Sequence, residues 1–341
     1  MRVLLYCDVP FLLAHGGAQV QIERTKAGLE ALGVNVEYLR WWDDRQRCDL
    51  IHAFGSIPST LVCVARTAGI PVVLTSLLTA ACNYSHSRLL AQTFLTRTLR
   101  AMLDPLGIGQ QLQWAAFREC AVNVVGLLSE RQVLETVHGV SSERIAVVPL
   151  GLSSTYLRAG PGPRSQPHLI CTGTITPRKR TLEIAGLARE ARVPVLFVGK
   201  PYSEEDPYWL KFRSLIDGHW VLHHPHVESD EEMIRLLREA RGFVLASRYE
   251  NWCLSAHEAI ACGLPILIPD QNWSRERFGE TACYWPSRGA AAAGALRGFY
   301  DACPDLSAPP VRLYSWEEVA GELQPVYRRV LERWRGATDA G

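Results

Sequence analysis

The sequence of 341 residues lacks any uninterrupted apolar run close to the roughly 20 residues that a membrane-spanning helix needs. It also lacks an excess of charge of one sign. Its 36 Lys and Arg against 35 Asp and Glu give a formal net charge of +1, which argues against nucleic acid as the main partner. The N-terminus does not resemble a signal peptide, because the short run Arg2 to Cys7 leads directly into Asp8 and Pro10. We therefore expect a soluble protein of the cytoplasm.

The ten cysteines lack the C-x-x-C spacing that is typical of zinc sites and redox motifs. Several lie inside apolar runs, among them Cys63, Cys120, Cys171 and Cys262. Such positions favour small buried thiols in a reducing compartment over disulfides. We expect no metal site.

Hydrophobic residues make up 48% of the chain and charged residues 21%, which is typical of a soluble globular protein. Apolar runs alternate with helical patterns through both halves, and this order predicts two α/β domains with parallel sheets. The turn-forming stretch Gly160-Pro-Gly-Pro163 is the predicted linker. The predicted domains are residues 1–160 and 161–312, followed by a closing helix over 313–336.

One segment in the second half holds the main candidate site. The apolar run from Gly242 to Ala246 predicts a buried strand, and Leu254 to Cys262 predicts a helix that stops at Gly263. The N-terminus of a helix that follows a strand is suited to an anion, because its first N–H groups lack partners. Glu250 lies in the loop between them. From the residues alone, a surface carboxylate and a helix that only packs remain an equal alternative.

Two further stretches follow predicted strands. Gly16-Gly17 follows Val3 to Tyr6, and the cations Arg178, Lys179 and Arg180 follow the strand that ends at Thr172. Glycine lets backbone N–H groups approach a phosphate, and clustered cations pair with a diphosphate. Taken alone, the glycines favour a tight turn, and a solvated charge cluster is the alternative for the cations.

The spacing Glu250-x7-Glu258, followed by Ala-Ile-Ala-Cys-Gly-Leu-Pro265, resembles the donor site of retaining glycosyltransferases with two Rossmann-like domains. These are the GT-B enzymes of family 4, or glycosyl transferases group 1. The resemblance covers nearly the whole chain and is weakest between Tyr84 and Glu119. It implies two domains that face each other across a cleft, with the closing helix crossing back to the first. It also implies hexosyl transfer from a nucleotide sugar, with no metal and no cofactor.

The resemblance implies a role for each matching residue. Glu250 would contact the transferred sugar and Glu258 the ribose of the nucleotide. Lys179 matches the lysine of the family, and Arg178 compensates for an arginine that Thr174 replaces. Together the two cations would neutralise the leaving diphosphate, which is electrostatic stabilisation of developing charge.

The remaining donor contacts follow from the same resemblance. The N-terminal glycine loop would face the diphosphate, and the Gly-Phe-Gly that usually follows the first glutamate is here Asn-Trp-Cys. Because the contacts of this loop are largely made by backbone amides, the substitution is compatible with donor binding. The predicted donor-binding positions are Gly16, Gly17, Gly173, Thr174, Asn251, Trp252, Cys253, Leu254 and Glu258.

The sequence departs from the family pattern at one histidine position. Many members have a histidine near the reacting sugar, whereas the matching positions here are Ser76 to Leu78, with His86 the nearest replacement. His52 is expected to be structural. The departure keeps two other functions open: a non-catalytic partner that binds a sugar nucleotide, and a sugar-nucleotide epimerase. The acceptor, whether a glycan, a lipid-linked molecule or a small molecule, is not defined by the sequence.

Residues 88–103 combine apolar side chains with interleaved arginines, Arg88, Arg97 and Arg100. An amphipathic basic segment of this kind can lie on an anionic membrane surface, here the inner face of the membrane. The other interpretation is a helix that packs on its domain and shapes the acceptor pocket. We favour packing, and membrane contact stays open.

Overall fold

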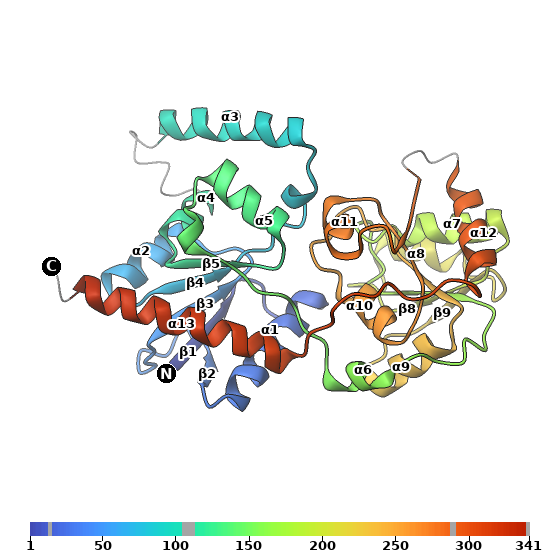
Figure 1. Ribbon diagram of the computed structural model, residues 1–341, viewed down its shortest axis with the longest axis horizontal. Helices are drawn as coiled ribbons and strands as arrows, with labels where there is room; N and C mark the ends of the chain where they lie inside the picture. The colour runs from blue at the N-terminus through green and yellow to red at the C-terminus, as the bar shows by residue number, and fades with distance from the viewer. Residues whose placement is uncertain (13–15, 104–112, 287–290, 339–341) are drawn as a thin grey trace. The chain divides into compact units, whose positions relative to one another are not determined.

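The computed structural model describes residues 1–12, 16–103, 113–286 and 291–338 (Figure 1). Contacts divide the chain into two compact units. The first unit comprises Met1–Leu12, Ala18–Gly151 and Trp316–Gly341, and the second unit comprises Leu13–Gly17 and Leu152–Ser315. Among the described residues, no helix is both long and apolar enough to span a bilayer.

The first unit contains a six-stranded, fully parallel sheet in the order β2-β1-β3-β4-β5-β6. In β3 to β5 every residue is buried, as expected for parallel strands covered by helices on both faces. The central pairing sets Val3 opposite Leu50. The strands are β1 Arg2–Cys7, β2 Asn35–Tyr38, β3 Leu50–Phe54, β4 Val72–Thr75, β5 Val122–Val125 and β6 Ile145–Val147.

Helices cover both faces of this sheet. On one face, α2 and α4 contribute Val62, Ala65 and Ala116 to a core with Ile51 and Leu74. On the other face α1 packs against α13, where a Cβ on Gly28 would lie 2.7 Å from the carbonyl oxygen of Trp316. The helices are α1 Gly17–Ala31, α2 Ser59–Thr67, η1 Ala81–Asn83, α3 His86–Leu103, α4 Gln113–Glu119, α5 Leu128–Val133, η4 Leu134–His138, η5 Ser142–Arg144 and α13 Trp316–Thr338.

The closing helix α13 is joined to the sheet of the first unit by a buried polar network, so its predicted return to the first domain is confirmed. His52 Nδ1 lies 2.6 Å from the Tyr327 hydroxyl of α13, and His52 Nε2 lies 2.7 Å from Thr75 Oγ1. Burial lowers the pKa of His52 to about 3, so the ring is neutral. These contacts give His52 the structural role that the sequence predicts.

We expect Tyr327→Phe to lower the free energy of unfolding by about 1–3 kcal/mol, because it leaves a buried His52 nitrogen without its partner. The urea midpoint of unfolding measures this change. Tyr38→Phe is the control, since Tyr38 is partly exposed and its loss should fall within about 0.5 kcal/mol. Equal midpoints for both variants would contradict a structural role for the network.

The second unit contains another six-stranded parallel sheet, in the order β12-β11-β10-β7-β8-β9. Leu169 pairs with Val195, and Gly242 pairs with Leu169 on the other side. The prediction of two parallel-sheet domains is thus confirmed. The strands are β7 Leu169–Thr172, β8 Val195–Val198, β9 Val221–His224, β10 Gly242–Val244, β11 Ile266–Ile268 and β12 Cys283–Tyr284.

The core of the second unit lies between this sheet and α7, α8 and α12, which contribute Ile184, Phe212 and Phe299. On the other side α6 packs against α9 and α10, and for this reason the unit begins at Leu152, ahead of the predicted linker. The helices are α6 Ser154–Ala159, α7 Thr181–Ala191, α8 Pro207–Arg213, α9 Asp230–Glu239, α10 Leu254–Ala261, α11 Asn272–Phe278 and α12 Ala292–Ala302.

Candidate active site

The candidate site lies at the carboxyl ends of β7 and β10. From β7 the chain continues outward through β8 and β9, whereas β10 pairs with the opposite edge of β7 and leads to β11 and β12. The β7–β10 pair is therefore the point where the strand order reverses, and open α/β sheets bind ligands in the crevice at such a point. The loop after β7 carries Arg178 and Lys179, and the loop after β10 carries Glu250.

These two loops are joined by ion pairs that the sequence did not predict. Glu250 Oε1 accepts hydrogen bonds from Lys179 Nζ at 2.6 Å and from Arg178 Nη1 at 2.8 Å. The backbone N–H of Arg248 also donates to the carbonyl of Arg178 at 2.8 Å. The side chains of Glu250 and Lys179 are 9% and 12% exposed, whereas that of Arg178 is 41% exposed. The cluster therefore combines a buried carboxylate and lysine with an arginine that reaches solvent.

The charges in this cluster hold one another in the ionised form. Burial alone would raise the pKa of Glu250, but Lys179 and Arg178 outweigh it and lower that pKa below its usual value. Burial would likewise lower the pKa of Lys179, and the adjacent Glu250 carboxylate outweighs it and raises that pKa. At neutral pH the cluster carries two positive charges and one negative charge. Its net charge of about +1 suits an anionic ligand.

The loop between Glu250 and α10 is anchored by Trp252, a predicted donor-binding position. Its indole is buried and stacks on the His257 ring, with the two ring centroids 5.1 Å apart. The Arg277 guanidinium packs over the same indole, 4.2 Å from its centroid. The side chain therefore fixes the loop, and any donor contact here would come from the backbone. The sequence reasoning gave Arg277 no role, since a residue so far along the chain carries no local signal of this cation–π contact.

Cys253 takes the place of the second glycine in the family pattern. It has φ +61, in the left-handed region that glycine adopts freely and other residues adopt at a cost. From this position it forms the N-cap of α10, and the next residue, Leu254, starts the helix. The thiol is buried and its pKa is raised to about 11, so it is not a thiolate nucleophile at neutral pH. Asn251 lies in the same loop and is half-buried.

Glu258 lies on α10, one helix turn after Leu254. Burial raises its pKa to about 7, the nearby Asp230 carboxylate adds to the rise, and Lys179 opposes it. The carboxyl group therefore changes its charge near physiological pH, which is typical of functional sites. Asp230, at the start of α9, is a second residue that the sequence reasoning missed.

The glycine positions are placed as follows. Gly173 directly follows β7 with φ +138, and its N–H donates to the carbonyl of Val198 at 3.0 Å. Thr174 is the next residue and is half-buried. Gly16 has φ +132 and, with Gly17, is grouped by its contacts with the second unit. The backbone conformations at Gly16 and Gly173 thus require glycine, whereas their contacts with a donor remain predictions.

The end of β4, where the family has a histidine, is occupied by Ser76. Ser76 is buried, and its hydroxyl lies 3.4 Å from Asn123 Oδ1. His86 is the exposed first residue of α3. Within the described ranges, no three His, Cys, Asp or Glu side chains gather in a way that could hold a metal ion.

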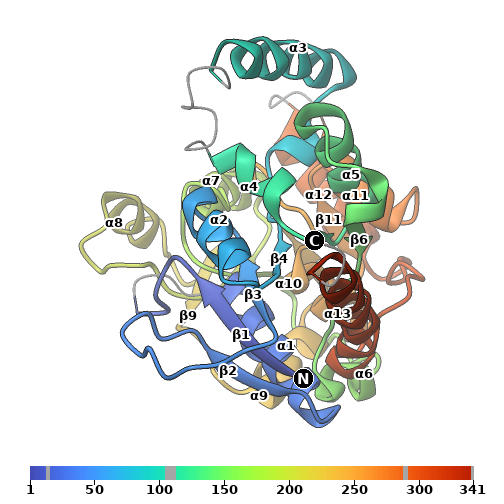
Figure 2. The ribbon, with the colours of Figure 1, turned by 90° about the vertical axis from the view of Figure 1, so that its left-hand side faces the viewer.

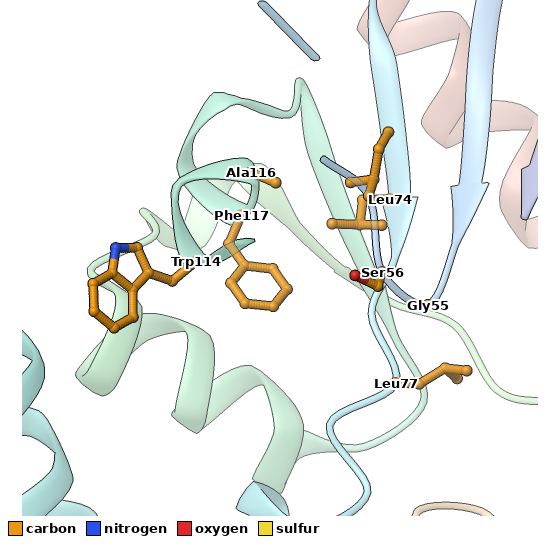
Figure 3. A pocket seen from close by; sticks show the side chains of 8 residues that line it. Gly55, Ser56, Leu74, Leu77, Trp114, Ala116 and Phe117 are labelled. Atoms are coloured by element: carbon orange, nitrogen blue, oxygen red, sulfur yellow. The ribbon is translucent and has the colours of Figure 1, made fainter. Parts of the chain in front are cut away.

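The first unit has a pocket of about 420 Å³ at the carboxyl ends of β3 and β4 (Figure 3). Figure 3 shows Trp114 and Phe117 of α4 on one side of it and Ser56, Leu74 and Leu77 on the other. Most of its lining is apolar, with the Ser56 hydroxyl among the few polar groups. Such a pocket suits a ligand with an apolar part.

Comparison with known proteins shows which family this part of the chain is similar to. Residues 166–301, which carry β7, both cations, Glu250 and Glu258, match the family model "Glycosyl transferases group 1". The resemblance to this family is confirmed. A curated relative of this chain is the O-antigen chain mannosyltransferase B of Escherichia coli, 28% identical over 156 residues. That alignment covers 41% of this chain and 40% of the relative, so the chain spans about two fifths of the length of the curated relative it matches.

Solved structures extend the likeness to the whole fold. A sucrose-phosphate synthase from Thermosynechococcus elongatus aligns with 97% of this chain and 99% of its own, at a TM-score of 0.66 and 15% identity. HepE from Anabaena, in complex with UDP, aligns over 100% of both chains at a TM-score of 0.61 and 14% identity. The chain thus has the GT-B fold, as the sequence predicts.

Proposed function

We propose that this protein is a retaining glycosyltransferase of the hexosyl-transferring type. It moves a sugar from a nucleotide-sugar donor to an acceptor hydroxyl, and it requires no metal ion or cofactor. The observation that carries the proposal is the buried Glu250 carboxylate, held by Lys179 and Arg178 at the β7–β10 switch point within the group 1 match. HepE, which has the same fold, was solved in complex with UDP-glucose.

In this proposal the donor diphosphate binds between the two cations and the start of α10. The first N–H groups of a helix have no acceptor within the helix, and the helix dipole favours negative charge there. Lys179 supplies a buried charge and Arg178 a more exposed one, so together they take the place of a divalent cation. As the bond from the sugar to the phosphate breaks, they stabilise the charge that builds up on the leaving group.

Glu250 accepts hydrogen bonds from hydroxyls of the transferred sugar, and its two cations keep it ionised for this task. The acceptor oxygen attacks the anomeric carbon on the face that the leaving phosphate occupied. One C–O bond forms, the C–O bond to the phosphate breaks, and a phosphate oxygen takes the acceptor proton. Retention of the anomeric configuration is supported by the resemblance of the Glu250-x7-Glu258 pattern alone.

We place the acceptor at the pocket of the first unit. Its mainly apolar lining favours an acceptor with an apolar part next to the reacting hydroxyl, such as a lipid-linked sugar, and the Ser56 hydroxyl can orient that group.

The test is a panel of UDP-, GDP- and ADP-sugars incubated with the protein and with simple or lipid-linked sugar acceptors. Release of nucleoside diphosphate identifies the donor, and proton NMR of the product gives its anomeric configuration. We expect retention, and unchanged turnover with a chelator present. Inversion would exclude the proposed mechanism, conversion of the donor without an acceptor would identify an epimerase, and binding without turnover would identify a non-catalytic partner.

Glu258 is predicted to accept hydrogen bonds from the ribose hydroxyls in its ionised form. Its pKa of about 7 means that most of the groups are ionised at pH 8 and few at pH 6. The donor KM should therefore rise by about tenfold from pH 8 to pH 6, because it is inversely proportional to the fraction of Glu258 that is ionised. In Glu258→Gln we expect a raised KM that is flat over this range, and steady-state kinetics at several pH values measure both.

Asp230→Asn is the matched variant for this prediction. Removing the Asp230 charge should lower the pKa of Glu258 and move the rise in KM to lower pH. If the pH profile of Glu258→Gln equals that of the unaltered protein, Glu258 is not the titrating group.

A further inference from the structure

The helix α3 exposes several large apolar side chains to solvent. Of its residues, all of which the structure describes, only Thr96 is buried. Its exposed side chains include Phe94, 74% exposed, and Met102, 62% exposed. A surface helix of a globular protein normally places its apolar stripe toward the core and its polar residues outward. In α3 the half-buried Leu89, Leu99 and Leu103 lie on the inner side with Thr96. A second set of apolar side chains faces outward, and packing within the unit does not account for this set.

The exposed apolar residues share one face of the helix, which also includes the polar Ser87 and Thr98. At about 100° per residue they cover an arc of about 140°, which Arg97 borders on one side and Arg88 on the other. Side chains three and four positions apart are neighbours on this surface. The residues of this apolar face are Leu90, Ala91, Phe94, Leu95, Ala101 and Met102.

The helix α3 is itself positively charged. The sequence from His86 to Leu103 contains three arginines and no acidic residue. Arg100 donates to the carbonyl of His138 on η4 at 3.1 Å. Burial, followed by the charges of Arg100 and Arg118, lowers the pKa of His138 to about 4, which places a further cation of α4 close by.

The helix is also accessible within its unit. Both views show α3 as an outer element, with α4 and α5 between it and the sheet of the first unit (Figures 1 and 2). The helix contacts mainly η4, on the side that carries Thr96 and Arg100. The apolar face thus points away from the rest of the unit.

We propose that α3 lies on the surface of an anionic membrane, with its apolar face among the acyl chains and with Arg88 and Arg97 at the headgroups. An apolar arc bordered by cations and without acids matches a bilayer that contains anionic lipid, because both burial and charge favour that contact. Long arginine side chains reach from the edge of such a helix to the headgroup level. The inference concerns a surface of the first unit and does not depend on the proposed function.

The experiment is co-sedimentation of the whole protein with vesicles of phosphatidylcholine, with and without about a third of phosphatidylglycerol. We expect pelleting with the anionic vesicles, little with the neutral ones, and release as salt is raised, because headgroup attraction is screened. Equal pelleting with both compositions, or none with either, would overturn the proposal. The assay needs no donor or acceptor, so its failure leaves the proposed reaction untouched.

Two variants and one control test the helix itself. Leu90→Ser with Phe94→Ser should lower vesicle affinity by about tenfold or more, and Arg97→Gln should weaken binding to anionic vesicles and reduce its salt dependence. Val64→Ser on α2 is the control, since Val64 is 68% exposed outside the apolar face and its loss should leave binding unchanged.

Unaltered melting temperatures of all variants show that they fold. An equal loss of binding in Val64→Ser would contradict a specific role for α3. A second copy of the chain is the competing occupant. If the lipid-free protein is a dimer that the Leu90 and Phe94 substitutions dissociate, the apolar face is a protein interface and the membrane proposal is wrong.

Discussion

Glu250→Gln is expected to lose sugar transfer by a factor on the order of 10² or more, while donor binding persists. Glutamine has the shape of glutamate without its charge, so it is a weaker acceptor for a sugar hydroxyl. The change also removes the one negative charge of the cluster with Lys179 and Arg178. Nucleoside diphosphate should therefore bind as tightly as before or more tightly. Turnover and calorimetric titration measure the two effects separately.

The variant will also alter stability, because Lys179 is left buried without its counter-charge. The depressed pKa of Glu250 adds stability above its unfolded value of 4.5, and this is lost as pH falls through the folded pKa. An assay well below the melting temperature keeps the variant folded. Glu239→Gln is the control, since Glu239 forms an exposed ion pair with Arg235 at 3.1 Å. Near-normal turnover in Glu250→Gln would refute the role of Glu250.

Lys179→Met should have the second largest effect, a fall in kcat/KM of about 10²–10³. The substitution keeps the length of a side chain that is 12% exposed and removes its charge. The leaving diphosphate then loses its buried cation. Without Lys179, only the charge of Arg178 opposes the effect of burial on Glu250, so the pKa of Glu250 should rise. The loss of activity at acidic pH should then begin at a higher pH than in the unaltered protein.

The difference in side-chain exposure between Lys179 and Arg178 determines which of the two substitutions costs more activity. Because Arg178 is 41% exposed, water screens its charge, and Arg178→Met should cost less activity than Lys179→Met. Lys211→Met, on the exposed side of α8, is the control and should leave activity unchanged. Equal losses in the Lys179 and Arg178 variants would contradict the assignment of the buried charge to Lys179.

The sequence predicted the sheets well because their signal is local. Strands buried on both faces read as continuous apolar runs, as in Val72–Thr75 and Val195–Val198. Once the strand order is known, residues that follow neighbouring strands must meet at one edge. Glu250 and Lys179 are 71 residues apart in the sequence, but they follow the neighbouring strands β10 and β7 and therefore meet as a pair.

Tertiary contacts explain what the sequence did not predict. Ser129-x-x-Gln132 resembles a capping box, yet the α5 N-terminus uses the Glu130 carboxylate, which accepts from the N–H groups of Gly126 and Leu127. By contrast, Ser229-x-x-Glu232 ahead of α9 does cap that helix, since the Ser229 hydroxyl accepts from Glu232 N–H at 3.3 Å. Several side chains can satisfy one helix end, and packing selects among them.

The helix over residues 88–103 does pack on its domain through η4, as favoured from the sequence, but its outward face was not predicted. The apolar spacing predicted a helix correctly, but spacing alone does not tell which way an apolar face points. The structure turns Phe94 outward and Thr96 inward. Residues 104–112, the continuation of this part of the chain, lie outside the described residues.

Thermal unfolding with each nucleotide sugar, compared with the corresponding free sugar and nucleoside, tests whether the cluster around Glu250 binds a sugar donor. A ligand at 100 times its Kd adds about 2.7 kcal/mol of stability, so at least one nucleotide sugar should raise the melting temperature clearly. We expect Lys179→Met to abolish most of this shift and Lys211→Met to keep it. If no nucleotide sugar shifts the unfolding of the unaltered protein, or if Lys179→Met responds as strongly, the cluster around Glu250 is not a donor site.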